Sequence, residues 1–167
     1  MSLRRLLLLI PLVGCASVPG DTTLEVTFNP CEPLVLVPAP DSTAAEIASI
    51  DVAIDLWARR GVSTLMRADG RSGGGLPIRF EDAAGAFHGV YEDEVGVVYV
   101  NRRIEDDHAR AVTIAHEVGH AMGLLHVDPA ERVSLMNPGN MDVEPTDLDR
   151  AALAAIWGAY PTAPTSR

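Results

Sequence analysis

The chain is organised around residues 116–126, which read His116-Glu117-Val118-Gly119-His120-Ala121-Met122-Gly123-Leu124-Leu125-His126. Side chains four residues apart lie on one face of a helix, so His116 and His120 can offer two imidazole nitrogens to a single cation. Gly123 suits the left-handed turn that ends a helix, after which His126 can reach the same cation from outside the helix. Three neutral histidines leave a fourth tetrahedral position open, which is typical of a catalytic rather than a closed structural zinc site.

Glu117 projects beside the face of the helix that carries His116 and His120. From there its carboxylate can take a proton from a water molecule at the metal without being a ligand itself, so we expect it to act as a general base. A single histidine on an apolar helix is usually an ordinary buried residue. Three histidines at this spacing, together with the glutamate, form a pattern that rarely arises by chance.

The stretch resembles the signature H-E-x-x-H-x-x-G-x-x-H of the metzincin zinc proteases, in particular a matrixin-like catalytic domain. A segment that resembles their Met-turn follows it, Ser134-Leu135-Met136-Asn137-Pro138. The resemblance implies one catalytic Zn²⁺ on His116, His120 and His126, with Met136 beneath the metal as an apolar floor that does not ligate. Astacin-like and serralysin-like members place a tyrosine where this chain has Pro138, so we expect no tyrosine that moves on and off the metal.

The order of the remaining elements resembles that of a compact metzincin domain, so we expect a domain of the α+β class over residues 34–160. The resemblance implies a twisted mixed β-sheet with two helices, one of them the zinc helix, and a small C-terminal subdomain with the Met-turn and one helix. Apolar runs and alternation predict strands at 34–37, 76–80, 88–92 and 95–101.

Three helices are predicted from caps and apolar periodicity. Thr43 and Glu46 form a capping-box pattern before the first helix, which Gly61 ends. The acidic residues 105–107 precede the zinc helix, where the helix dipole favours negative charge. Thr146 caps the last helix. The predicted apolar stripe of that helix consists of Leu148, Ala152, Ala155, Ile156 and Trp157.

The first residues are typical of an export leader. Arg4 and Arg5 precede a short apolar run, which ends in a segment that resembles the lipobox of bacterial lipoproteins, Leu12-Val13-Gly14-Cys15. The resemblance implies that residues 1–14 are removed and that Cys15 carries a lipid that anchors the domain to a membrane. Ala16 implies sorting to the outer membrane of a two-membrane bacterium, facing the periplasm or the surface. The alternative is an ordinary secretory leader that is cut nearby.

Residues 15–33 are interpreted as a tether or N-terminal segment, and residues 161–167 as a polar tail. Residues 23–28 alternate like a strand. With Cys15 lipidated, Cys31 has no cysteine to pair with, so we expect an unpaired thiol and no intramolecular disulfide. Matrixins hold a propeptide cysteine on the zinc as a latency switch. This role is the alternative interpretation of Cys31, although its flanking residues do not match the switch motif.

The charge of the chain argues against nucleic acid as a partner. The formal charge is −10, and loss of Arg4 and Arg5 with the leader takes it to −12, so nucleic-acid phosphates and anionic lipids repel the chain. The acidic residues 81–82 and 92–94 follow no calcium-loop order, so we interpret them as solvated acids and leave calcium unsupported. With 47% hydrophobic residues and no repeat, we expect one domain and a monomer.

The function that these patterns predict is that of a zinc-dependent endopeptidase outside the cytoplasm, acting on a protein or peptide. We expect the substrate to lie extended against an exposed strand edge within residues 85–94, and a wall of the specificity pocket to come from residues 136–141. Two alternatives stay open: a lipid-anchored metal- or peptide-binding module without turnover, and a zinc hydrolase of a non-protein substrate. Glu117 argues against the first alternative, because a pure binding site needs no base.

Overall fold

The computed structural model describes residues 26–69 and 74–158, so the predicted leader with Cys15 and the tail lie outside it. Within these ranges the chain forms a five-stranded sheet and three helices, which is the α+β class that the sequence predicts. None of these helices has the length and apolar character needed to cross a bilayer. The elements follow in the order β1 (Leu34–Pro38), α1 (Ala44–Ala58), β2 (Leu65–Arg67), β3 (Leu76–Glu81), β4 (Gly89–Glu92), β5 (Val97–Asn101), α2 (Asp107–Ala121) and α3 (Asp147–Trp157).

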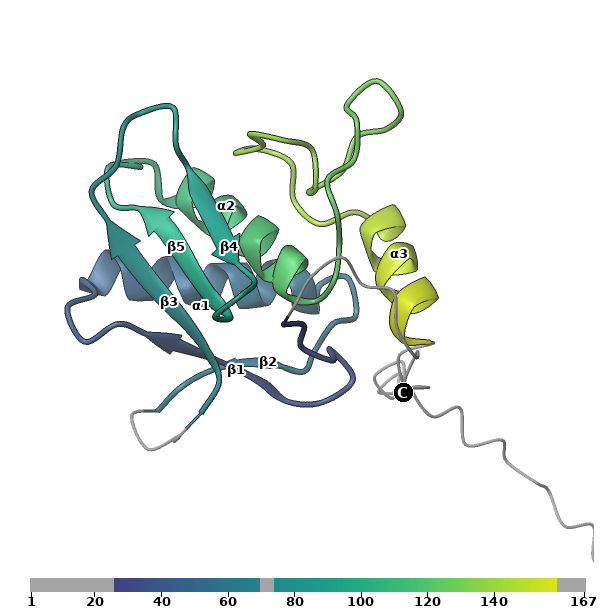
Figure 1. Ribbon diagram of the computed structural model, residues 1–167, viewed down its shortest axis with the longest axis horizontal. Helices are drawn as coiled ribbons and strands as arrows, with labels where there is room; N and C mark the ends of the chain where they lie inside the picture. Colours follow the sequence, from purple (N-terminus) through teal and green to yellow (C-terminus); the bar gives the residue numbers. More distant parts are fainter. Residues whose placement is uncertain (1–25, 70–73, 159–167) are drawn as a thin grey trace, which may run out of the picture.

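The sheet is mixed, with its one antiparallel strand at an edge. In space the strands follow the order β2-β1-β3-β5-β4. All neighbouring pairs are parallel except β4 with β5. Figure 1 shows α1 and α2 side by side against the sheet, and α3 apart from it beside the loops that follow α2. Among residues 26–69 and 74–158, no strand pairs with the outer side of β4, and β4 lies next to the helix that carries His116 and His120.

Strand β2 is an element that the sequence analysis missed. It has three residues, of which only Leu65 is buried, so it shows no period-two pattern. It forms because β1 offers a free parallel edge, on which Leu34 pairs with Leu65 and Leu36 pairs with Arg67. This strand forms because it pairs with β1 in the folded chain, and its local sequence propensity does not predict it.

Helix α1 begins as the sequence predicts and is tied to α2 at its far end. The N–H of Glu46 donates to Thr43 Oγ1 at 3.2 Å, and the N–H of Thr43 donates to Glu46 Oε2 at 2.6 Å, which completes a capping box. Near the end of the helix, the buried Trp57 donates from Nε1 to the carbonyl of Ala115 at 3.0 Å. This bond fixes α1 against the middle of α2.

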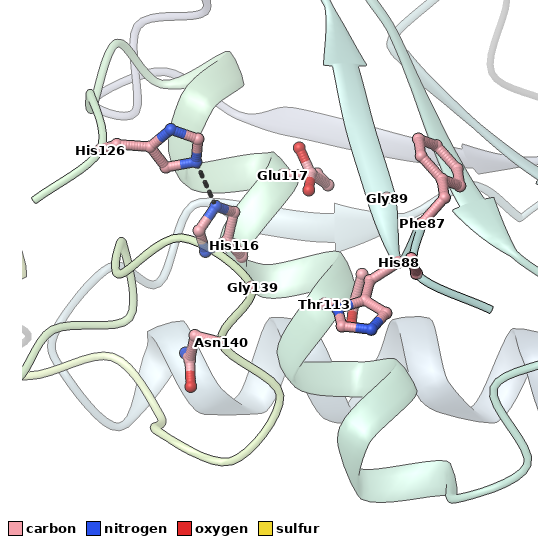
Figure 2. A pocket seen from close by; sticks show the side chains of 10 residues that line it. Phe87, His88, Gly89, Thr113, His116, Glu117, His126, Gly139 and Asn140 are labelled. Carbon is pink, nitrogen blue, oxygen red and sulfur yellow. Dashed lines mark hydrogen bonds between the residues drawn. The ribbon is translucent and has the colours of Figure 1, made fainter. Parts of the chain in front are cut away.

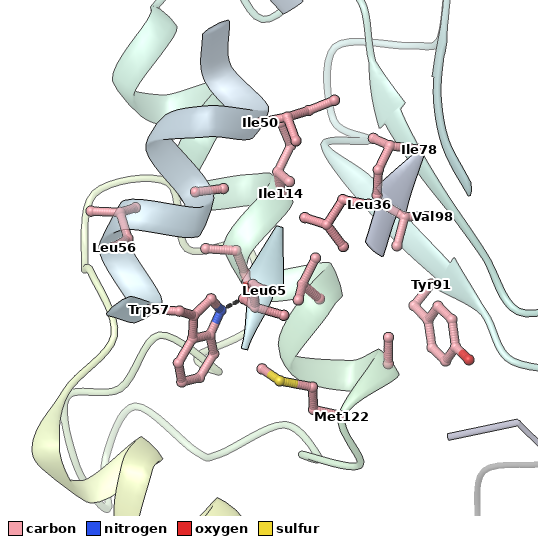
Figure 3. Packing of buried hydrophobic residues seen from close by; sticks show 14 of the residues in the cluster. Leu36, Ile50, Leu56, Trp57, Leu65, Ile78, Tyr91, Val98, Ile114 and Met122 are labelled. Atoms are coloured by element: carbon pink, nitrogen blue, oxygen red, sulfur yellow. Dashed lines mark hydrogen bonds between the residues drawn. The ribbon is translucent and has the colours of Figure 1, made fainter. Parts of the chain in front are cut away.

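The main core lies between the sheet and the helices α1 and α2. Figure 3 shows aliphatic side chains of both layers meeting there. Burying a side chain of this size contributes about 1.5–3 kcal/mol relative to leaving it in water, so this layer holds α2 firmly against the sheet. Its fully buried members include Leu36, Ile50, Ile78, Val98 and Ile114.

Helix α3 begins at the predicted cap, and its buried face agrees only in part with the predicted stripe, of which Ala152, Ile156 and Trp157 pack against the core. Leu148, which the sequence analysis placed in the apolar stripe, is 51% exposed, whereas Leu153 is fully buried. The cause is Asp149, whose carboxylate turns inward and is hydrogen-bonded there. Leu153 lies one turn further along the same face. A buried carboxylate thus orients this helix, which an apolar pattern cannot reveal.

The segment that precedes β1 packs against the domain. The hydroxyl of Tyr91 donates to the carbonyl of Val26 at 2.6 Å, and the N–H of Phe28 donates to the carbonyl of Ala121 at 2.8 Å. Residues 26–28 do not form a strand, so this part of the predicted strand is wrong, while the rest lies outside the described residues. The chain is therefore held beside the end of α2.

Cys31 corrects another prediction, because it is disulfide-bonded rather than an unpaired thiol. The residue that it pairs with lies outside the described ranges. The N–H of Cys31 donates to Asn29 Oδ1 at 2.9 Å. The prediction of a free thiol depended on Cys15 being consumed by a lipid. A sulfur in a disulfide bond cannot serve as a thiolate ligand, so Cys31 does not act as a zinc latency switch in this state.

Candidate active site

Helix α2 carries two of the three histidines and turns the chain back toward the third. Asp106 caps its first turn, because its carboxylate accepts the N–H of Ala109 at 2.7 Å. Gly123 follows the helix with a φ of 96°, a left-handed conformation that suits glycine. The N–H of Leu124 then donates to the carbonyl of Gly119 at 3.0 Å, which folds the chain back along the helix.

The imidazole rings of His116, His120 and His126 converge. Nε2 of His126 lies 3.2 Å from Nε2 of His116 and 3.2 Å from Nε2 of His120. A tetrahedral ion with metal–nitrogen distances of about 2.05 Å would separate its nitrogens by about 3.3 Å, so the spacing fits a cation such as zinc. Within residues 26–69 and 74–158 this is the one cluster of three or more His, Cys, Asp or Glu side chains close enough to share a metal.

The remaining ring nitrogens define the tautomers of His116 and His120. Nδ1 of His116 lies 2.7 Å from the carbonyl oxygen of Leu135, and Nδ1 of His120 lies 2.7 Å from that of Leu124. A carbonyl oxygen can only accept, so each Nδ1 carries the hydrogen and each Nε2 presents a lone pair. Nε2 of His126 can donate to only one of the two. Hydrogen bonds alone therefore leave the cluster unsatisfied, whereas a shared cation satisfies it.

Burial keeps two of these imidazoles neutral. Desolvation lowers the pKa of His116. Desolvation, together with the neighbouring His116, lowers the pKa of His120 to about 4. Only neutral imidazole can ligate a metal, so both rings have the protonation state of ligands at neutral pH.

Glu117 lies beside the three rings, where the sequence predicts it. Figure 2 shows its carboxylate between the histidines and strand β4. The residue is 6% exposed. This burial raises the pKa of Glu117 to about 8, although a hydrogen bond from the N–H of Tyr91 opposes the rise. A carboxyl group that titrates near neutral pH can both take up and release a proton, as general acid–base catalysis requires.

Gly89 allows β4 to approach α2 closely. A Cβ atom at this position would lie 2.9 Å from Cγ2 of Thr113 and 3.1 Å from Cγ and Oε1 of Glu117. Any other residue would therefore push the strand away or displace the carboxyl group. The sequence analysis assigned no role to Gly89, although a glycine inside a strand signals a close approach of this kind.

Met136 packs directly against α2. It is 1% exposed, and a Cβ atom at Gly119 would lie 2.7 Å from its sulfur. The N–H of Asn137 donates to the carbonyl of Ser134 at 3.2 Å, which closes a turn around the methionine. The N–H of Val127 donates to the carbonyl of Met136 at 3.0 Å, so this turn also holds the chain next to His126.

Two cavities meet at Glu117 and follow strand β4. Both include Gly89, Glu117 and His126 in their walls. The first, of about 190 Å³, extends toward small and polar groups (Figure 2), namely Thr113, His88, Gly139 and Asn140, with Phe87 at its side. The second, of about 280 Å³, extends toward the apolar side chains of Val90 and Leu125. The cleft therefore differs in polarity on the two sides of the carboxylate.

Several residues that line the first cavity beside His116, His126 and Glu117 were not predicted as site residues. His88, Thr113 and Asn140 come from a strand flank, a helix and a loop, and no spacing in the sequence links them. Two broader predictions include some of these residues. The substrate edge within residues 85–94 includes His88, and the pocket wall at residues 136–141 includes Asn140. His108 lies two turns before His116 and is exposed. It does not join His116, His120 and His126, the metal-type cluster.

Comparison with known proteins identifies the fold. No protein-family model matches the sequence, and neither does any curated protein. The solved structure of high choriolytic enzyme 1, a hatching enzyme zinc-protease from the medaka fish Oryzias latipes, is similar over 86% of this chain and 98% of its own, with 12% identity and a TM-score of 0.51. This chain has the hatching-enzyme fold.

The solved structure of myroilysin is also similar, over 60% of this chain and 52% of its own, with 15% identity and a TM-score of 0.45. This chain therefore spans about half the length of myroilysin. The hatching-enzyme fold agrees with the resemblance to zinc proteases that the histidine motif predicts. At 12% identity the likeness concerns the fold alone, so the chemistry must be argued from the residues of the site.

Proposed function

We propose that this chain is a zinc-dependent endopeptidase of the metzincin kind. The observation that carries the proposal is the convergence of three Nε2 atoms, with two separations of 3.2 Å, beside a buried glutamate. A structural zinc site is closed by a fourth protein ligand, whereas three ligands leave a position for water or substrate. The fold shared with a hatching enzyme zinc-protease supports the same class of reaction.

The residues of the site would have two roles, which are to bind the metal and to transfer a proton. His116, His120 and His126 would hold zinc. When bound, zinc would act as a Lewis acid and lower the pKa of a water molecule bound to it to about 7. Glu117 takes the proton of the attacking water and returns it to the leaving amine. Burial gives this carboxyl group a pKa of about 8 in the metal-free protein, and a cation nearby lowers that value, which favours the base form.

The substrate is proposed to lie as an extended strand on the unpaired edge of β4. The sheet ends at β4, and both cavities run along it. Antiparallel pairing is slightly more stable per residue than parallel pairing. A peptide antiparallel to β4 would place the residues before its scissile bond near Val90 and Leu125. The residues after that bond would lie near Thr113 and Asn140, beside the proposed wall of the specificity pocket at 136–141.

Met136 is proposed as the floor of the metal site. Its sulfur and methyl group pack against α2 at Gly119, which lies between the two histidines of the helix. An apolar side chain at this place restrains the helix face without competing for the metal. We propose no calcium site and no tyrosine ligand, since Pro138 stands where some metzincins carry the tyrosine.

The test is cleavage of a mixed peptide library by the full chain loaded with zinc, with and without a chelator. Cleavage that stops with the chelator and returns with zinc supports the endopeptidase. Zinc binding without any cleavage supports the binding-module alternative. A lack of peptide cleavage together with turnover of ester or amide substrates that are not peptides supports the third class, a zinc hydrolase of a non-protein substrate.

The role of Glu117 is tested separately. We expect Glu117→Gln to keep zinc binding and fold but to lower kcat by at least about 100-fold, since the amide cannot accept the proton. The matched control is Glu105→Gln, which changes an exposed acid just before the same helix and should leave kcat unchanged. A Glu117→Gln variant with full activity would remove the proposed base.

We also propose, from the sequence, that residues 1–14 are removed and that the mature chain is exported and anchored by a lipid on Cys15. This proposal competes with an intramolecular disulfide at Cys31, because the chain has only two cysteines and a thioether sulfur cannot form a disulfide. Cys15→Ser should release the chain from the outer-membrane fraction, and the wild-type Cys15 peptide should carry the mass of a lipid. A Cys15–Cys31 peptide pair in the mass spectrum would refute the anchor.

A further inference from the structure

The carboxylate of Asp149 is buried in the turn that precedes and includes Met136. It is 1% exposed, and no cation forms a salt bridge with it in the described part of the chain. Its charge is instead satisfied by hydrogen-bond donors. Oδ1 accepts the hydroxyl of Ser134, while Oδ2 accepts the N–H of Leu135 at 3.0 Å and both the N–H and the hydroxyl of Thr146 at 2.8 Å.

A continuous series of hydrogen bonds joins this carboxylate to a histidine of the metal-type cluster. The hydroxyl of Ser134 donates to Asp149 and accepts the N–H of Met136 at 3.0 Å. That N–H belongs to the peptide group between Leu135 and Met136. The carbonyl oxygen of the same peptide group accepts Nδ1–H of His116 at 2.7 Å. From His116 to Asp149, every donor therefore points the same way.

The direction of these bonds has an electrostatic consequence. Hydrogen bonds in series polarise one another, and a negative charge at the accepting end strengthens each of them. The charge of Asp149 thus increases the electron density on the carbonyl oxygen of Leu135. A stronger acceptor at Nδ1 makes Nε2 of His116 a better electron donor and fixes the plane of the ring.

We propose that Asp149 is a positioning residue for the metal site, acting on His116 through Ser134 and the peptide group between Leu135 and Met136. The inference rests on the proposed function in so far as the ion is zinc. Loss of a group that supports a metal ligand typically weakens metal binding 10- to 100-fold. Because Asp149 acts through two intervening groups, we expect about a tenfold weakening when the series is broken.

Asp149 is also a member of the capping box of α3, whose N-cap residue is Thr146. The test must therefore separate the effect of the capping box from that of the series of bonds. Ser134→Ala breaks the series and leaves Thr146 bonded to Asp149. Thr146→Ala removes the hydroxyl that bonds to both the side chain and the N–H of Asp149, and leaves the series intact. The two substitutions are of similar size and lie on opposite sides of one carboxylate. They therefore form a matched pair.

The experiment measures the zinc dissociation constant of the full chain by competition with a chelator, and the visible spectrum of the cobalt-substituted protein. We expect Ser134→Ala to raise the dissociation constant about tenfold and to shift the cobalt bands, and Asp149→Asn to do the same. We expect Thr146→Ala to lower the urea midpoint of the metal-free protein, while its dissociation constant stays within about twofold of the wild type.

Three outcomes would overturn the proposal. They are wild-type zinc affinity and an unchanged cobalt spectrum in both Ser134→Ala and Asp149→Asn, an equal loss of affinity in Thr146→Ala, and a wild-type chain that binds no zinc. Zinc binding by a wild-type chain that hydrolyses no peptide contradicts only the proposed function. In that case the measured dissociation constants still decide the role of Asp149.

Discussion

At the scale of single residues, burial shifts the pKa values of the site's histidines and of its glutamate in opposite directions when no metal is bound. Burial holds the pKa of His120 at about 4 and that of His116 below its ordinary value, while it raises the pKa of Glu117 to about 8. Below pH 6.5 the unfolded chain binds more protons at these histidines than the folded chain, so acid destabilises the fold. Between pH 4.5 and 8 the folded chain keeps the proton of Glu117 that the unfolded chain has lost, so base also destabilises it.

We therefore expect the free energy of unfolding of the metal-free protein to rise with pH up to about 6.5. In that range the extra protons that the unfolded chain binds at two histidines outnumber the one that the folded chain keeps on Glu117. Above pH 6.5 only the glutamate contributes, so the free energy of unfolding should fall toward pH 8. Each pKa unit corresponds to about 1.4 kcal/mol. The measurement is thermal unfolding in a chelator between pH 4 and 9. In Glu117→Gln the decline above pH 6.5 should disappear. A wild-type stability that keeps rising to pH 8 would contradict the raised pKa.

The sequence predicted the residues whose spacing is local and missed those that meet only in space. His116, Glu117 and His120 were predictable because the geometry of one helix fixes their relation. No role in the site was predicted for Asp149, since its inward orientation depends on Ser134 and Leu135. The same orientation explains why Leu148, which was predicted in the apolar stripe of α3, is exposed.

At the scale of elements, the approach of β4 to α2 makes the cleft. We expect Gly89→Ala to lower the free energy of unfolding by about 1–3 kcal/mol, because its Cβ would lie 2.9 Å from Thr113 Cγ2. Since the same atom would lie 3.1 Å from Glu117, kcat/KM should fall at least about tenfold. Urea unfolding and peptide cleavage measure the two effects. Gly85→Ala is the control, since its Cβ would meet nothing within 4 Å, and equal results for both variants would refute the close approach.

The elements themselves were largely predictable where a strand or helix is long enough to show its own pattern. The capping box at Thr43 and the helix that follows it are confirmed, as are the four longer strands. Strand β2 was missed because it exists only as a partner of β1. The order of the strands in space was not predicted either, since it depends on which edges pair rather than on any single segment.

At the scale of the whole molecule, zinc should stabilise the folded chain. A ligand that binds only the folded state at a hundredfold excess over its dissociation constant contributes about 2.7 kcal/mol, so we expect the unfolding temperature to rise by several degrees at pH 7. Differential scanning calorimetry with and without zinc measures this. His120→Ala should lose the increase, whereas His108→Ala, which changes an exposed histidine outside the cluster, should keep it. A rise that survives in His120→Ala would place the metal elsewhere.

The short length of β4 limits which targets could be cut. The strand offers four residues, and at about 3.3 Å per residue its edge is about 13 Å long. A polypeptide laid along it must give up any helix or sheet of its own over that distance. We therefore expect native globular proteins to resist digestion except in long loops or frayed ends, and denatured or intrinsically disordered chains to be degraded readily.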